Sequence, residues 1–83
     1  MDYAKIVRDL INDSIVDAGY ILDDVLYEKE GKFYFLRVVI DKNGIITIDD
    51  CTKVTRIINP ILDENDPISD SYILDVCSKE KGE

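Results

Sequence analysis

The chain has 83 residues, a net charge of −8, and 46% apolar and 34% charged residues. This length allows one small domain with a modest core, and the apolar content is too high for a disordered chain. Each half of the chain, residues 1–41 and 42–83, holds nine acidic and five basic residues, so the sequence disfavours direct binding to nucleic acid and favours a basic protein partner.

Residues 3–18 carry apolar side chains at the spacing of one helix face. That face contains Tyr3, Ile6, Val7, Leu10, Ile11, Ile15 and Ala18. Charged and amide side chains fill the other face, which predicts an amphipathic helix. Gly19 follows at the position where many helices end in a left-handed residue.

Residues 20–29 and 33–40 predict two strands joined by a hairpin turn at 30–32. In the first strand the apolar positions change face near Asp23 and Asp24, which predicts a bulge there. In the second strand both faces are largely apolar. These faces are Tyr34, Leu36, Val38 and Ile40 on one side and Phe33, Phe35, Arg37 and Val39 on the other.

The stretch TIDDCTKVTR predicts the start of a second helix. Thr47 and Asp50 have the spacing of a capping box, although Asp49 as the capping residue is a close alternative. Residues 45–48 before it read as a short extended segment. An apolar stripe then continues along the helix, and Pro60 is expected to kink or end its regular part because proline lacks the donor N–H.

Residues 63–70 predict an acidic loop, 71–77 a last strand, and 78–83 a solvated tail. The predicted order is therefore helix, strand, strand, helix, strand in a single domain covering residues 1–83. We expect an α+β fold, α-β-β-α-β, with both helices packed on one face of a small, about three-stranded mixed sheet.

The sequence gives little support for an enzyme or a metal protein. It contains no histidine, and carboxylates on adjacent helical residues, such as Asp49 and Asp50, point about 100° apart. Cys51 and Cys77 lack close partners for a zinc site and fit small buried side chains. The acidic loop lacks the central Gly and distal Glu of a calcium-binding loop. We therefore expect no catalytic residue, no metal and no cofactor.

No apolar run approaches the roughly 20 residues that a membrane span needs. The N-terminal stretch MDYAKIVRDL has the charge pattern of a helix and not that of a signal peptide. Two cysteines far apart in sequence do not make a disulfide framework. We expect a cytoplasmic protein with reduced thiols that does not enter a membrane.

Five short stretches stand in a particular order and spacing over residues 3–78. They are Gly19-Tyr20 with Leu22 and Val25, then LRVVID at 36–41, TIDDC at 47–51, DENDPI at 63–68 and YILDV at 72–76. Together they resemble the N-terminal domain of the RimP family of bacterial ribosome maturation factors. The resemblance implies an α/β domain with a non-enzymatic role in late assembly of the small ribosomal subunit. It also implies a partner, a basic ribosomal protein near the decoding centre.

Members of that family continue after the last strand with a Ser-Ser-Pro-Gly-Leu-type segment and a second, SH3-like barrel domain. In this chain Cys77-Ser78 is followed by KEKGE, so we expect the C-terminal SH3-like domain to be absent. The rival interpretation of the sequence is a small acidic α/β interaction domain with an unrelated partner.

The residues expected to bind the partner fall into two groups. The first group is an acidic surface on loops and helix starts, formed by Asp49, Asp50, Asp63, Glu64 and Asp66. The second group is the apolar outer face of the second strand, which helices on the other face would leave uncovered, and it consists of Phe33 and Phe35. If Asp49 and Asp50 are engaged in capping, they contribute to stability instead of binding.

Overall fold

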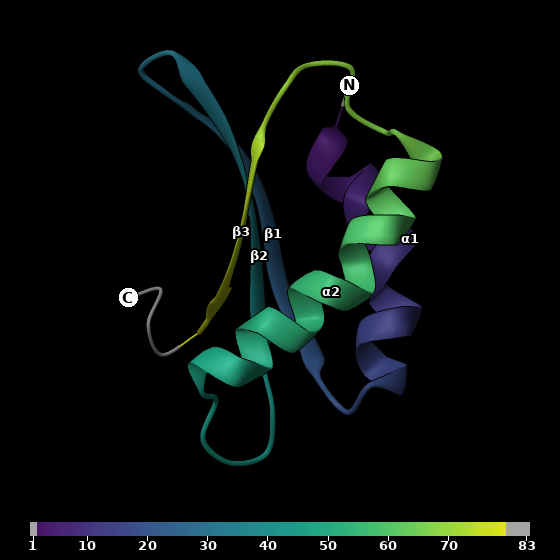
Figure 1. Ribbon diagram of the computed structural model, residues 1–83, viewed down its shortest axis with the longest axis vertical. Coiled ribbons are helices and arrows are strands. Elements are labelled where there is room, and N and C mark those ends of the chain that lie inside the picture. The colour runs from purple at the N-terminus through teal and green to yellow at the C-terminus, as the bar shows by residue number, and fades with distance from the viewer. Residues whose placement is uncertain (1, 80–83) are drawn as a thin grey trace.

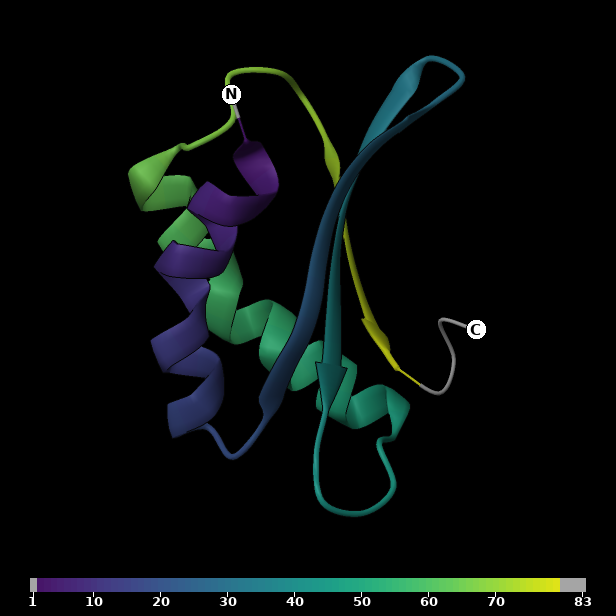
Figure 2. The same cartoon turned by 180° about the vertical axis from the view of Figure 1, so that it is seen from behind.

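The computed structural model describes residues 2–79. The elements in chain order are α1 (Tyr3–Asp17), β1 (Ile21–Glu30), β2 (Phe33–Asp41), α2 (Ile48–Asn65) and β3 (Ile73–Ser78). The strands form one sheet in the order β1-β2-β3, with β1 and β2 antiparallel and β2 and β3 parallel. Both helices lie on one face of this sheet, as Figure 1 and Figure 2 show from opposite sides. The predicted α+β fold is confirmed.

The first helix and the hairpin form as the sequence predicts. Asp2 caps α1 by accepting a hydrogen bond from the amide of Lys5 at 3.1 Å. Gly19 follows the helix with φ +92°, a left-handed conformation that only glycine adopts without strain. The strand register shifts between Leu22 and Asp24, which confirms the bulge. This extra residue returns Val25 to the side of the sheet that faces the helices, where it is buried.

The core lies between the sheet and the two helices. Its buried apolar side chains are Val7, Ile11, Ile15, Tyr20, Leu22, Val25, Leu36, Val38, Ile40, Val54, Ile58, Leu62 and Ile68. Full burial of one large apolar side chain stabilises a fold by about 1.5–3 kcal/mol. The helix-facing side of β2 contributes most consistently, because Leu36, Val38 and Ile40 are all 0% exposed. Neither helix in residues 2–79 is long and apolar enough to cross a membrane.

The start of α2 confirms the capping box. Thr47 is the capping residue, with its hydroxyl accepting from the Asp50 amide and the Asp50 carboxylate accepting from the Thr47 amide. The alternative with Asp49 as the cap is wrong, because Asp49 lies inside the first turn. The expected extended segment stops at Thr47, whose backbone is extended, and Ile48 already belongs to the helix.

The end of α2 differs from the prediction. The helix continues through Pro60 to Asn65, so residues 63–65 are helical and the acidic loop begins only at Asp66. Figure 1 shows that the second half of α2 runs in a different direction from the first half, as expected where a proline interrupts the hydrogen-bond ladder. The side-chain Nδ2 of Asn65 donates to the Ile61 carbonyl at 2.8 Å and satisfies one terminal acceptor.

The C-terminal end of the described chain also differs. Ser78 was predicted to begin a solvated tail, yet it is the last residue of β3 and only 2% exposed. The pairing continues one residue further, because the Lys79 amide donates to the Ile40 carbonyl at 3.0 Å. The rest of the predicted tail, residues 80–83, lies outside the described residues.

Candidate functional site

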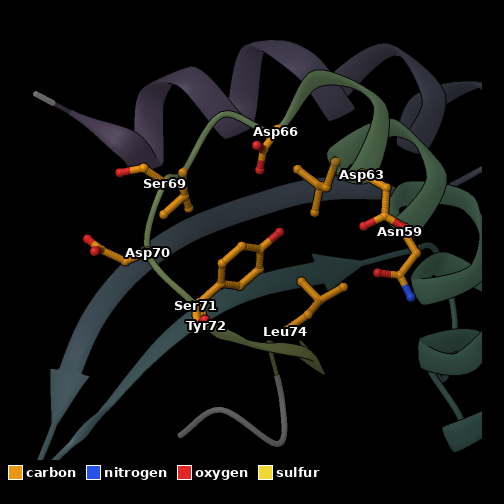
Figure 3. Close-up of a pocket in the computed structure, with 10 residues that line it drawn as sticks. Asn59, Asp63, Asp66, Ser69, Asp70, Ser71, Tyr72 and Leu74 are labelled. Carbon is orange, nitrogen blue, oxygen red and sulfur yellow. The ribbon is translucent and has the colours of Figure 1, made fainter.

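A pocket of about 540 Å³ opens between the C-terminal end of α2, the loop that follows it and the start of β3 (Figure 3). The helix contributes Asn59 and Asp63 to its lining, and the loop contributes Asp66 and Asp70. Tyr72 stands at the junction of loop and strand. Three carboxylates from two elements therefore surround one hollow, although they are spread over eight positions of the sequence.

The Tyr72 ring occupies the middle of this pocket. Figure 3 shows the side chains of Asp63, Asp66 and Asn59 pointing toward the ring, whereas Asp70 points away from it. The pKa of Tyr72 is raised, first by burial of its hydroxyl and then by the negative charges of Asp63 and Asp66. The pocket thus has a negative potential around an aromatic face, and both features attract a cation.

Buried side chains on both sides hold the acidic loop in place. Leu62 in the last turns of α2 and Ile68 in the loop are each 2% exposed and belong to the core. Between them, Asp66 adopts the left-handed conformation, with φ 45° and ψ 55°, and its amide donates to the Leu62 carbonyl at 2.8 Å. This conformation turns the chain from the helix toward β3. The pocket acids consequently project from a backbone that is anchored to the core.

The chemistry of the pocket suits an organic cation. Among residues 2–79 there is no group of three or more His, Cys, Asp or Glu side chains that could hold a metal ion. Asp63, Asp66 and Asp70 are exposed carboxylates, which can accept hydrogen bonds from a lysine ammonium or an arginine guanidinium. Asn59 adds an amide that can both donate and accept. The pocket can therefore take a basic side chain of another protein.

Asp50, one of the predicted docking acids, is engaged inside the fold at the other end of α2. Its carboxylate accepts from the Tyr20 hydroxyl at 2.6 Å and from the Thr47 amide at 2.8 Å, and lies 3.0 Å from the Lys42 ammonium. The Tyr20 hydrogen bond, followed by those of Thr47 and Lys42, holds the pKa of Asp50 far below its usual value. The side chain is 14% exposed, whereas neighbouring Asp49 is exposed. The structure thus separates this pair from the pocket.

The open face of the sheet, away from the helices, carries the apolar strip that the sequence predicts. Phe33 is 60% exposed, and Phe35 and Val39 are half-buried on the same face of β2. The cross-strand neighbours Leu26 on β1 and Ile73 on β3 extend the strip, at 38% and 45% exposure. The outward orientation of Phe33 and Phe35 is therefore confirmed.

An ion cluster interrupts this apolar strip. The Arg37 guanidinium lies 2.8 Å from Glu28, 2.7 Å from Glu30 and 3.4 Å from Asp75, so it links side chains of all three strands. The central guanidinium carbon of Arg37, Cζ, also lies 5.2 Å from the centre of the Phe35 ring. The hydrogen bond with Glu30 is the largest of the causes that raise the pKa of Arg37. The cluster keeps a charged group in the middle of an otherwise apolar surface.

The sequence indicated only part of the acidic pocket. Asp63 and Asp66 line it as neighbours in the predicted acidic stretch, whereas Glu64 is exposed on the last turn of α2 and does not line it. Asp70 belongs to the predicted acidic loop but is not among the predicted docking residues. The sequence places Tyr72 within the last strand, whereas β3 begins only at Ile73, and nothing in the spacing of Tyr72 signals a site. A search for aromatic side chains close to acidic loops would have found it.

The fold and the pocket define a small α+β domain with an acidic surface pocket around Tyr72. The chain matches the RimP N-terminal domain over residues 10–79, which is most of its length, and it belongs to that family. The resemblance seen in the sequence is therefore confirmed. RimP proteins are ribosome maturation factors that act on the small ribosomal subunit, and the family is generally non-enzymatic.

Proposed function

We propose that this domain takes part in maturation of the small ribosomal subunit in the cytoplasm by binding a basic ribosomal protein near the decoding centre, without covalent chemistry. Family membership supports the assembly role. The choice of a basic protein as the partner rests on the acidic pocket around Tyr72, in a chain of net charge −8. A negative surface and a basic protein attract each other over distances near the Debye length, about 8 Å at 0.15 M salt.

In this proposal an arginine or lysine side chain of the partner enters the pocket. Asp63 and Asp66 accept its hydrogen bonds, and the Tyr72 ring lies against the charged group. Asp70 stands on the outer side, where it can guide the approaching charge. Complementary charges of this kind raise the association rate more than they raise affinity. We therefore expect salt to slow the association of the two proteins.

The other predicted docking residues have different parts in this proposal. Asp49 and Glu64 are exposed and extend the negative surface along α2. Phe33 and Phe35 offer an apolar contact on the open face of the sheet. Asp50 contributes chiefly to stability, because its carboxylate already has three partners within the fold.

The test is a double charge reversal, Asp63→Lys with Asp70→Lys. Both side chains are exposed, so the variant should keep the melting temperature of the wild type. Asp66 is left in place because lysine would be strained at its φ of 45°. Affinity for each purified basic protein of the small subunit is measured at about 0.15 M salt. We expect several-fold weaker binding of one such protein, mainly through slower association.

The matched control is Asp9→Lys with Asp13→Lys, which changes the net charge equally on the exposed side of α1. If both double variants lose affinity equally, net charge alone drives binding and the pocket has no special part. If the pocket variant binds as well as the wild type, the partner docks elsewhere. Binding of no ribosomal protein by the wild type, together with tight binding of an unrelated basic protein, would favour the rival interpretation.

A further inference from the structure

β3 forms an edge of the sheet that has few of the usual protections against pairing with another strand. The strand order β1-β2-β3 places β3 at one edge and β1 at the other. Within Ile73–Ser78 the only charged residue is Asp75, and there is no proline. The β1 edge, in contrast, has a bulge and the charged residues Asp23, Asp24, Glu28, Lys29 and Glu30. Charges and bulges are the features that keep an edge from pairing.

The main-chain groups of Leu74 and Val76 face away from β2. The Lys79 amide donates to the Ile40 carbonyl at 3.0 Å, which fixes the side of the strand that pairs inward. Because main-chain groups alternate in direction along a strand, those of Cys77 and Asp75 also point toward β2. The amides and carbonyls of Leu74 and Val76 then point outward, in the geometry that a further strand would need.

The side chains of β3 also indicate that this edge of the sheet is incompletely covered. Leu74 and Val76 pair in register with Leu36 and Val38 of β2 and point toward the helices like them. Leu36 and Val38 are 0% exposed, yet Leu74 and Val76 are only half-buried. The difference arises because β2 has a neighbour on both sides and β3 on one side alone within residues 2–79. A further strand would complete their burial.

The acidic pocket lies at the start of this edge. Tyr72 and Leu74 line it from β3 and its approach, and Asp63 lines it from α2 (Figure 3). Successive side chains of an added strand would point alternately toward the helices and toward the open face. A side chain of the added strand that points toward the helices near Leu74 would reach the pocket, where three aspartates favour a positive charge. Charge complementarity thus selects a basic segment for this edge.

We propose that β3 accepts an extended basic segment of a partner protein as a fourth strand of the sheet. The main chain of the segment pairs with Leu74 and Val76, and one arginine or lysine side chain enters the acidic pocket. Main-chain hydrogen bonds supply affinity in this mode of recognition, and the pocket for an alternate side chain supplies specificity. The basic character of the segment rests on the proposed function, whereas the pairing rests on the open edge alone.

The first test uses an alternating Lys-Val peptide of about six residues, the usual length of a strand. Amide hydrogen exchange is followed by NMR with the wild-type chain. The amides of Leu74 and Val76 should exchange fast in the free chain and become protected on binding, whereas those of Asp75 and Cys77 are protected throughout. The control is the same peptide with N-methylated alternate residues, which keeps the charge but cannot form a strand pair. It should bind at least about tenfold more weakly.

The second test compares Val76→Pro with Val76→Ala. Both variants lose the same half-buried side chain, but only proline removes the outward amide, which an edge strand tolerates. We expect the Lys-Val peptide to bind Val76→Pro at least about tenfold more weakly than Val76→Ala. If Val76→Pro does not fold, the N-methylated peptide on the wild-type chain still decides the question.

Four results would overturn the proposal. The first is equal affinity for the plain and N-methylated peptides, and the second is peptide binding without protection of the Leu74 and Val76 amides. The third is protection of these amides in the free chain that grows with its concentration, which would assign the edge to a second copy. A ribosomal protein that binds wild type and Val76→Pro equally would refute strand addition and leave the proposed function intact. Pairing with the peptide, without binding of any ribosomal protein by the wild type, would support strand addition and refute the proposed function.

Discussion

Replacing Leu36 with alanine should lower the free energy of unfolding by about 2–5 kcal/mol, the range found when a filled core position is emptied. Leu36 is 0% exposed on the middle strand, where it packs into the core between sheet and helices. Domains of this size have a total stability of about 5–15 kcal/mol. The single substitution should therefore remove a large share of the stability, which urea denaturation would show as a lower midpoint.

The matched control is Leu26→Ala. Leu26 lies on the neighbouring strand but on the open face, where it is 38% exposed. The same atoms are removed, yet the cavity term is small because solvent already reaches the site. Similar shifts of the urea midpoint for Leu36→Ala and Leu26→Ala would contradict the arrangement in which both helices cover one face of the sheet.

Asp50→Asn should lower the melting temperature at pH 7 by about 5 °C or more, since a domain of this size loses several degrees when one important cap is weakened. The wild type should also lose its extra stability in acid. The pKa of Asp50 is lowered in the folded state, chiefly by the Tyr20 hydroxyl. The stabilisation is therefore complete at neutral pH and is lost as the pH falls below about 4, the value for an unfolded aspartate.

The acid limb of the stability curve should consequently be shallower in Asp50→Asn than in the wild type. Asp49→Asn is the control, because Asp49 is the adjacent residue, carries the same charge and is exposed. Thermal unfolding between about pH 2 and 7 covers the range in which an unfolded aspartate titrates, and this is where the stabilisation begins to be lost. Equal melting curves for the two variants would show that the contacts of Asp50 with Tyr20 and Lys42 do not stabilise the fold.

The hydrogen bond between Tyr20 and Asp50 should also make the stability of the fold depend on pH in the alkaline range. The hydrogen bond to Asp50 and burial raise the pKa of Tyr20 to about 12. A raised pKa means that the stabilisation is fully present below about pH 10, the value for an unfolded tyrosine, and is lost as the pH rises from there toward the folded value. Tyr20→Phe should remove that dependence and leave the Asp50 carboxylate with one partner fewer. An unchanged alkaline limb in this variant would argue against the hydrogen bond.

Local signals explain why so much of the fold could be predicted from the sequence. The capping box needs only Thr47 and Asp50, three positions apart, and the bulge needs only the change of face before Val25. Such features depend on neighbouring residues, so the sequence contains all of the relevant chemistry. The strand faces of β2 follow from simple alternation in the same way.

Features that depend on distant residues could not be predicted. The sequence allows Pro60 either to kink the helix or to end it, and the choice depends on tertiary contacts. The helix continues to Asn65 because Leu62 packs into the core, and this contact outweighs the lost hydrogen bond. Asp66 ends the helix in a conformation that the sequence rule assigns to glycine. The pocket exists only because the loop brings the end of α2 to the start of β3. The acids near Asp63 could be named, but their arrangement around Tyr72 required the structure.

The long connection to β3 has a consequence for the order of folding. Arg37 and Asp75 pair across the parallel strands from 38 positions apart, whereas Arg37 and Glu28 pair across the hairpin from nine positions apart. Closing the longer loop costs more entropy, so the hairpin should form in the transition state before β3 docks. Val25→Ala should then slow folding, and Val76→Ala should mainly speed unfolding in stopped-flow measurements. β3, the strand with the unpaired edge, should therefore dock last during folding and detach first during unfolding. A partner that pairs with β3 would then slow unfolding of the whole domain.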